Sequence, residues 1–263
     1  MPGQPGIFVM LYLIIFIFGA VFGSFFNVCI SRIPNKKSVV FPDSSCPTCN
    51  TKIKPHHNIP IISYILLKGK CAYCGTKINI HYFLVELLTP ILLILLFVNL
   101  NAEISLVFFK YTIFISFGLI IFFIDLHHLI IPDKLSLPLI VIGLLLSLLP
   151  NTDIGWMSAG IGALSGFLVF LFTAFFFQKV TGKDSLGGGD IKLIAAIGAF
   201  LGVWGTLFTI LFSSLIAIVI LLIIKHDRKE PFPFGPFLIA GAFVYILAGD
   251  TLVGLYLRLY NIY

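Results

Sequence analysis

The chain has 263 residues, of which 59% are hydrophobic and only 11% are charged. A soluble globular domain has about 45–50% apolar and about 25% charged residues, so a water-soluble protein and a disordered one are both excluded. We expect a protein that crosses the membrane several times. The net charge of +6 is informative through its placement along the chain.

A transmembrane helix needs about 20 mostly apolar residues. Apolar segments cover residues 7–30, 82–100, 104–124, 135–149, 155–177, 191–224 and 235–257. The stretch 191–224 is too long for one crossing, and Gly202 and Gly205 predict a break that leaves two helices, at residues 191–201 and 204–224. The sequence therefore predicts an all-α polytopic membrane protein with about eight transmembrane helices.

The placement of the basic residues favours the same number of helices. With residues 31–81 in the cytosol, all but two of the 17 Lys and Arg residues lie in cytosolic segments, the exceptions being Lys110 and Arg258. Cytosolic loops of membrane proteins carry such an excess of Lys and Arg. A single helix over 191–224 would place Lys225, Arg228 and Lys229 on the opposite side. We expect both termini outside, and we assign the positive charge to membrane orientation and not to nucleic acid.

Three regions follow from this pattern. Residues 1–30 form a first transmembrane helix, residues 31–81 a cytosolic loop subdomain, and residues 82–263 a multi-helix membrane core. In the core, Gly162 and Gly166 are four residues apart, as are Gly198 and Gly202. This spacing of small residues lets helices approach closely in lipid, so we expect helix contacts there.

The cytosolic loop contains two CxxC pairs, formed by Cys46, Cys49, Cys71 and Cys74. Four thiolates complete a tetrahedral zinc shell with no open catalytic position, which predicts a structural site. Zinc would supply folding energy that so small a loop lacks. A redox CxxC is an alternative, and His56 and His57 are alternative ligands. The fifth cysteine, Cys29, is expected to pack in its apolar helix.

Charge in this loop is strongly one-sided, with eight basic residues and a single acid, Asp43. Two explanations stay open. The charge orients the chain and attracts anionic lipid, or it forms a site for an anionic cosubstrate.

Four acidic residues lie in or beside apolar segments on the predicted cytosolic side: Glu86, Asp125, Asp133 and Asp190. An ionisable group at membrane depth is costly and marks a functional site. Asp125 follows the segment 104–124, and Asp190 follows a Gly-Gly-Gly turn. Two carboxyls that meet at one membrane face can act as base on a water and as acid on a carbonyl, as in an aspartic peptidase. The glycines leave room for a substrate strand.

Simpler roles for these acids are a helix N-cap for Asp190 and a boundary position for Asp125. Asp133 is expected to cap the helix that follows it, and His127 and His128 to lie in an interfacial loop. Helix polarity adds a hypothesis about the pair. The anion is favoured on Asp190, at a helix N-terminus, and the proton on Asp125, at a helix C-terminus.

A series of motifs runs along nearly the whole chain, in the order Gly23-Ser-Phe-Phe-Asn27-Val, Arg32-Ile-Pro34, the two CxxC pairs with Asn58-Ile-Pro60-Ile-Ile-Ser63-Tyr64 between them, Val85-Glu86-Leu-Leu-Thr89, Asp125, Ile131-Pro132-Asp133, Gly187-Gly-Gly189-Asp190-Ile-Lys192-Leu and Pro233-Phe-Gly235-Pro236. In these motifs the chain resembles the bacterial type IV prepilin peptidases, and Gly187–Asp190 matches their GxGD signature.

The resemblance implies a membrane aspartic endopeptidase whose catalytic pair is Asp125 and Asp190, with Gly187, Gly189 and Lys192 in support. Its substrates would be prepilins and pseudopilins, cut after the Gly that ends a short basic leader, at the cytosolic face of the bacterial cytoplasmic (inner) membrane.

Cysteine-bearing members of this family are similar in a second activity, N-methylation of the new N-terminal residue from S-adenosylmethionine. The resemblance then makes Glu86 a candidate for methyl transfer or for binding the substrate amine. Two alternatives stay open. One is a peptidase with a purely structural zinc loop, and the other is a membrane transporter, although transporters hold their key carboxylates near the midplane.

Overall fold

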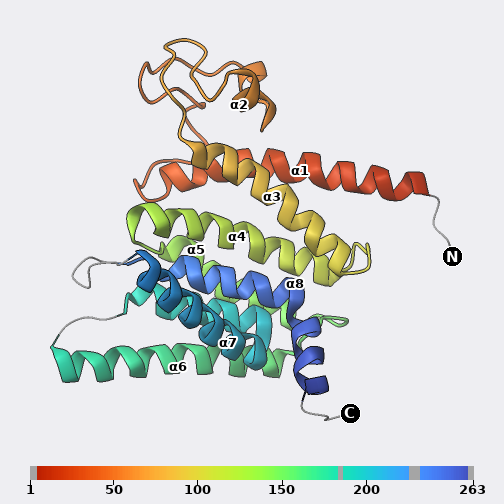
Figure 1. The fold of residues 1–263 in the computed structure, drawn as a ribbon, viewed down its shortest axis with the longest axis vertical. Helices are drawn as coiled ribbons and strands as arrows, with labels where there is room; N and C mark the ends of the chain where they lie inside the picture. Colours follow the sequence, from red (N-terminus) through yellow and green to blue (C-terminus); the bar gives the residue numbers. More distant parts are fainter. Residues whose placement is uncertain (1–4, 183–185, 225–231, 260–263) are drawn as a thin grey trace. The chain divides into compact units, whose positions relative to one another are not determined.

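The computed structural model describes residues 5–182, 186–224 and 232–259 (Figure 1). Within these ranges the chain forms helices, connecting loops and two isolated β-bridges, and no strand, so the predicted all-α class is confirmed. Among the described residues, five helices are long and apolar enough to cross a membrane. The number of eight crossings stays a prediction. The chain divides into two compact units, residues 1–103 and 104–263.

The first unit is built on two long helices, α1 (Pro5–Arg32) and α3 (Ile80–Asn99), with the cysteine loop between them in sequence. Glycines let the two helices touch. A Cβ on Gly19 would lie 2.6 Å from Cα of Pro90, and one on Gly23 would lie 2.9 Å from Cα of Glu86. Cys29 is buried in α1, as expected of a packing residue. The loop adds a 3-10 turn, η1 (Pro55–His57), and a short helix, α2 (Ile62–Leu66).

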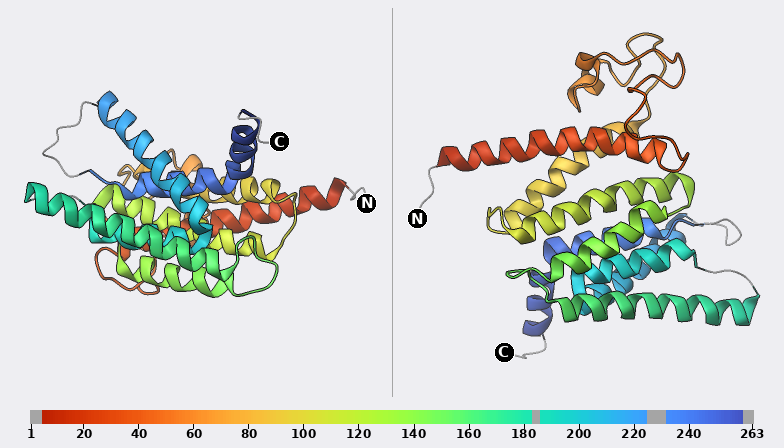
Figure 2. Two further views of the ribbon diagram at one scale, coloured as in Figure 1. Left: turned by 90° about the horizontal axis from the view of Figure 1, so that it is seen from below. Right: turned by 180° about the vertical axis from the view of Figure 1, so that it is seen from behind.

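The second unit contains α4 (Leu106–His128), α5 (Asp133–Ser147), α6 (Trp156–Thr181), α7 (Gly188–Ile224) and α8 (Gly235–Leu259). Its core is the first half of α7, and the helix as a whole packs against α5, α6 and α8 (Figure 2). Nearly every side chain from Leu193 to Leu201 is buried there. This half-helix is therefore shielded by protein and not by lipid.

The predicted break in the long apolar stretch is confirmed at Gly202. Its backbone leaves the helical conformation, with φ 67° and ψ −169°. Only glycine adopts these angles readily, because they place a Cβ against the backbone. Beyond the break, α7 carries exposed apolar side chains such as Leu211 and Leu215. The first half is thus enclosed by protein, whereas the second half has one face buried, at Thr206 and Thr209, and another face that exposes apolar side chains.

Glycines also bring α6 and α7 together. A Cβ on Gly162 would lie 2.6 Å from the backbone of Gly202, and one on Gly198 would lie 2.3 Å from the backbone of Gly162. A Cβ on Gly166 would lie 3.0 Å from Thr206. The expectation that these small residues form helix contacts is confirmed, since backbone meets backbone at this crossing.

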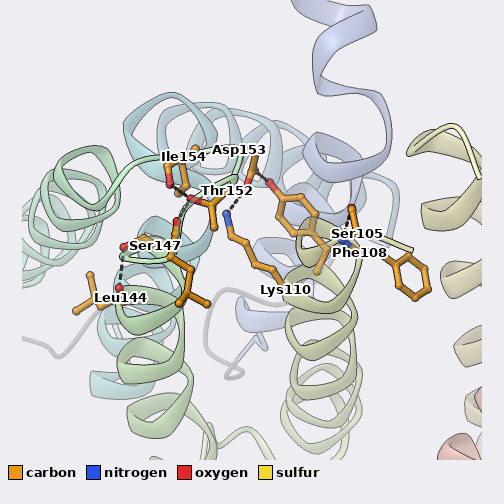
Figure 3. Close-up of polar contacts among 10 residues, drawn as sticks. Ser105, Phe108, Lys110, Leu144, Ser147, Thr152, Asp153 and Ile154 are labelled. Atoms are coloured by element: carbon orange, nitrogen blue, oxygen red, sulfur yellow. Dashed lines mark hydrogen bonds and ion pairs between the residues drawn. The ribbon is translucent and has the colours of Figure 1, made fainter. Parts of the chain in front are cut away.

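One buried cation lies near the start of α4 (Figure 3). Lys110 has no exposed surface, and its Nζ donates to Oδ1 of Asp153 at 2.6 Å. The hydroxyl of Tyr111 donates to the other oxygen of the same carboxylate. Asp153 belongs to the loop between α5 and α6, so the pair ties this loop to α4. Lys110, one of two basic residues predicted away from the cytosol, is thereby neutralised.

Two local expectations were wrong. His127 and His128 lie in the last turn of α4 and not in a loop, because the helix continues past residue 124 until Leu129 adopts a left-handed conformation. Asp133 is the first residue of α5, whereas the N-cap is Pro132, and no side chain caps this helix.

We predict that Asp153→Asn destabilises the protein by about 3 kcal/mol, because it leaves the buried ammonium of Lys110 without a counter-charge. Adding Lys110→Met should restore most of the loss. The matched control is Asp43→Asn, which breaks the exposed pair with Lys52 and should leave the unfolding midpoint unchanged. Thermal unfolding in detergent measures all three, and equal midpoints for the Asp153 and Asp43 variants would contradict the prediction.

Candidate active site

Asp125 lies in the last turn of α4 and is 5% exposed. Its Oδ2 accepts a hydrogen bond from the backbone N–H of Gly235, the first residue of α8, at 3.0 Å. A Cβ on Gly235 would lie 2.6 Å from the same oxygen. Only glycine therefore brings its amide this close, and a buried carboxyl is held by the start of another helix.

Asp190 lies in the first turn of α7, where its backbone N–H donates to the carbonyl of Gly187 at 3.0 Å. Asp190 and Asp125 lie in the same part of the unit, because Gly189, beside Asp190, and Gly235, which donates to Asp125, both pack against Ile131. The Oδ1 of Asp190 is buried and has no hydrogen-bond partner among the described residues. A buried acceptor without a partner is unusual and is typical of a site that receives a further molecule.

Ile131 occupies the space between the two glycine turns that flank this pair. A Cβ on Gly189 would lie 2.7 Å from Cβ of Ile131, and one on Gly235 would lie 3.0 Å from its Cδ1. A Cβ on Gly187 would lie 3.1 Å from Oδ2 of Asp190. The two glycine turns therefore approach one isoleucine from different helices and hold the carboxyls near each other.

A salt bridge links the first turns of α5 and α7, which both begin beside this site. Lys192 of α7 donates to Oδ1 of Asp133, the first residue of α5, at 2.6 Å. Both side chains are partly exposed, so the pair contributes orientation more than stability. Lys192 was expected in a supporting role without a partner being named, and the structure adds Asp133.

The helix positions assumed for the proton hypothesis are present. Asp190 lies at a helix N-terminus and Asp125 within one turn of a helix C-terminus. Which carboxyl carries the proton stays a prediction.

Glu86 belongs to the first unit, where it is half-buried on α3. Its Oε2 accepts the backbone N–H of Ile61 at 2.7 Å. The carboxylate therefore connects α3 to the residue before α2. This local contact was not expected from the sequence.

The four thiols of Cys46, Cys49, Cys71 and Cys74 come together, with all Sγ atoms within 4.8 Å of one another. Cys46 Sγ and Cys74 Sγ are 3.8 Å apart, which matches the spacing of about 3.8 Å across a tetrahedral site with metal–sulfur bonds of about 2.3 Å. Among the described residues no histidine joins this cluster, so the ligand set that fits is four thiols. The residues present therefore fit a tetrahedral metal ion.

Both halves of the cluster have the same backbone. The N–H of Cys46 donates to the carbonyl of Thr51, and the carbonyl of Cys46 accepts the N–H of Asn50. Cys71 makes the same two hydrogen bonds, with the carbonyl of Thr76 and the N–H of Gly75. Asn50 and Gly75 both have positive φ, a conformation that Asn and Gly tolerate best. Hydrogen bonding with Thr76 lowers the pKa of Cys74 to about 6, which favours its thiolate. The hydrogen bond and charge of Lys52 lower the pKa of Asp43, the one acid of the loop.

Comparisons with known proteins bear on both units. Residues 17–100 match the bacterial peptidase A24 N-terminal domain, and residues 112–222 match the type IV leader peptidase family. The chain is 36% identical to a prepilin leader peptidase/N-methyltransferase of Neisseria gonorrhoeae, over 89% of this chain and 90% of the relative. The chain belongs to the type IV leader peptidase family.

Other relatives with the same name align with almost the full length of this chain. The one from Aeromonas salmonicida is 33% identical over 93% of both chains, and the one from Bacillus subtilis is 35% identical over 94% of this chain and 98% of the relative. Asp125 and Asp190 fall within the stretch that matches the leader peptidase family, and Glu86 and the cysteines within the N-terminal match. No solved structure gave a match.

The sequence analysis did not predict several contacts in the site of this leader peptidase family member. The Pro-Phe-Gly-Pro motif around Gly235 was noted without a role, and its backbone donation to Asp125 joins residues 110 positions apart. Ile131 and Asp133 likewise belonged to a noted motif. The signal was present, but a pairing across helices is not readable along the chain.

We predict that Gly189→Ala destabilises the second unit by about 1–3 kcal/mol, because the new methyl group collides with Ile131. The neighbouring Gly188→Ala is the matched control, since nothing lies within 4 Å of a Cβ there. Thermal unfolding of both purified variants measures the difference. A midpoint for Gly189→Ala no lower than that for Gly188→Ala would show that the glycine turn is not packed against Ile131.

Proposed function

We propose that this chain cleaves the leader of type IV prepilins and pseudopilins and then methylates the new N-terminal residue. Relatives carrying both activities in their names match about nine-tenths of the chain or more, which supports this assignment. The structural observation that carries the peptidase half is that Asp125, held by Gly235, and Asp190, with its unpartnered oxygen, flank the same residue, Ile131.

In the proposed cleavage, Asp125 and Asp190 act together on a water molecule and on the peptide carbonyl of the Gly that ends the leader. One carboxylate removes a proton from the water as its oxygen attacks the carbonyl carbon, while the other carboxyl gives its proton to the carbonyl oxygen. Collapse of this intermediate breaks the C–N bond, and the leaving amine receives a proton from the pair. Oδ1 of Asp190 is the acceptor available for the water.

The backbone around the pair suits this reaction. Gly187 and Gly189 leave space beside Asp190 in which an extended substrate strand fits. Gly235 fixes one oxygen of Asp125, so the carboxyl meets the substrate already oriented. Lys192, paired with Asp133, positions the first turn of α7. These residues act through the carboxyls and do not react themselves.

We further propose that the site faces the cytosol from the bacterial cytoplasmic membrane. The excess of Lys and Arg on one side of the predicted topology supports this orientation. The cleaved pilin would keep its hydrophobic helix in the membrane, because the carboxyl pair lies at the end of α4 and the beginning of α7 and not at their centres.

The cysteine cluster would hold a structural zinc ion through Cys46, Cys49, Cys71 and Cys74, since four thiolates leave no open position for catalysis. S-adenosylmethionine would supply the methyl group when bound. We assign Glu86 to the substrate amine, because a half-buried carboxylate can accept the proton that an ammonium loses before its nitrogen is methylated. The hydrogen bond that it accepts from Ile61 orients it.

The test of the whole proposal is mass spectrometry of a prepilin co-expressed with the protein. Loss of the leader with one added methyl group is the expected result. Loss of the leader alone would identify a peptidase with a purely structural loop, and an unchanged prepilin would contradict the proposed function and favour a transporter.

We predict that Asp125→Asn and Asp190→Asn each lower the cleavage rate at least about 10²–10⁴-fold, because a neutral amide cannot transfer the proton. Glu103→Gln, an exposed acid outside the site, should cleave at the normal rate. Expression and the unfolding midpoint serve as controls for folding. Cleavage retained by either Asn variant would remove the carboxyl pair from the mechanism.

We predict that Cys71→Ser lowers the bound zinc to less than one ion per chain and loosens the cysteine loop, because three thiolates hold the ion less tightly than four. Cys29→Ser removes a buried cysteine outside the cluster and should leave the zinc content unchanged. Elemental analysis of the purified proteins measures the metal. Equal zinc content in the two variants would place the metal elsewhere.

A further inference from the structure

The short helix α2 presents apolar side chains outward. Ile62, Ile65 and Leu66 are 53%, 59% and 75% exposed, and Ile59 just before the helix is also exposed. A loop predicted to be cytosolic gains nothing by showing such side chains to water. Another surface must therefore cover this face.

The opposite side of α2 is fixed against the beginning of α3. Tyr64 stacks on Phe83 with ring centroids 5.1 Å apart, and Ile61 N–H donates to Glu86 at 2.7 Å. Both partners lie within the membrane-span candidate that begins at Ile80. In both Figure 1 and Figure 2, α2 lies beside the span formed by α1 and α3, and not beyond its ends. This position brings α2 to the depth of the lipid.

Backbone groups around α2 are satisfied from within the protein, as a segment that enters lipid requires. Ser63 Oγ accepts the N–H of Ile59 at 3.0 Å and donates to the carbonyl of His56 at 3.1 Å. Glu86 accepts the N–H of Ile61, as described above. Side chains thus provide partners that water provides for an ordinary cytosolic loop.

The backbone turn that leads into α2 is strained, so other contacts must stabilise it. Ile61 has φ 64° and ψ −54°, and Ile62 N–H donates to the carbonyl of Pro60 at 2.6 Å, which makes a classic γ-turn. A β-branched residue is rarely found at positive φ. The hydrogen bond from Ile61 to Glu86 holds this turn, which starts the helix that exposes the apolar side chains.

Basic residues follow α2 directly. Lys68 and Lys70 are both exposed, and no acidic residue lies between positions 44 and 85. An apolar face followed by lysines is the pattern of a segment that sits at the interface of an anionic membrane. A basic prepilin leader fits this surface less well, because the lysines would repel it.

We propose that residues 59–66, the α2 wedge, insert Ile62, Ile65 and Leu66 among the acyl chains of the leaflet in which α1 ends and α3 begins, with Lys68 and Lys70 at its anionic headgroups. The wedge then anchors the cysteine loop to the membrane beside α3. This inference rests on the membrane spans and the local contacts, and it stands whether or not the chain methylates its substrate.

The test places one tryptophan on the wedge of the full chain, in nanodiscs that contain anionic lipid. Leu66→Trp is made together with Trp156→Phe and Trp204→Phe, which remove the two native tryptophans. Thr48→Trp in the same background is the matched control, because Thr48 is exposed at the tip of the first CxxC pair. Quenching is measured with bromine-labelled acyl chains and, separately, with aqueous iodide. Unchanged zinc content confirms that the loop is intact.

The proposal predicts blue-shifted emission for the tryptophan at position 66, with bromolipid quenching severalfold stronger than at position 48 and iodide quenching severalfold weaker. Equal iodide quenching at the two positions would overturn it, because the face would then be in water. Protection from both quenchers would overturn it too, since protein would then cover the face. Ile65→Trp repeats the measurement in case one variant fails to fold.

Discussion

A carboxyl group inside an apolar helical bundle needs a partner, and the second unit is arranged around that requirement. Asp125 is nearly inaccessible to solvent, and its carboxyl accepts a hydrogen bond from the backbone N–H of Gly235. That bond brings the start of α8 to the end of α4, and Ile131 fills the space between this junction and the first turn of α7. Asp190 lies across Ile131 from this junction, and its Oδ1 has no partner among the described residues. The geometry proposed for catalysis is therefore a consequence of satisfying buried polar groups in a membrane protein.

The same requirement shapes the first unit. Glu86 and Ser63 accept backbone N–H groups around α2, and the four thiols are collected by two matching turns. A loop that lacks an apolar core of its own is held in this way by the membrane helices, and its four cysteines fit a metal ion that would stabilise it further. The membrane end of this loop and its cysteine cluster thus serve one purpose, which is to keep a small basic subdomain in a fixed conformation.

Much of this was readable from the sequence, because the signals were local. Apolar segment length predicted the helices, an over-long segment with Gly202 predicted the break in α7, and two CxxC pairs predicted the thiol cluster. Contacts between helices were not readable. The links from Asp125 to Gly235 and from Asp133 to Lys192 join distant positions, and the end of α4 at His128 depends on a left-handed Leu129 that has no strong sequence signal.

The central claim is that Asp125 and Asp190 act as one catalytic unit. The most direct measurement is the pH dependence of kcat/KM for leader cleavage by the purified protein in lipid. A unit with one carboxylate and one carboxylic acid predicts a bell-shaped profile whose two apparent pKa values belong to the pair. A rate that keeps rising through the pH range in which histidine and cysteine titrate would contradict the account, because another base would then activate the nucleophile.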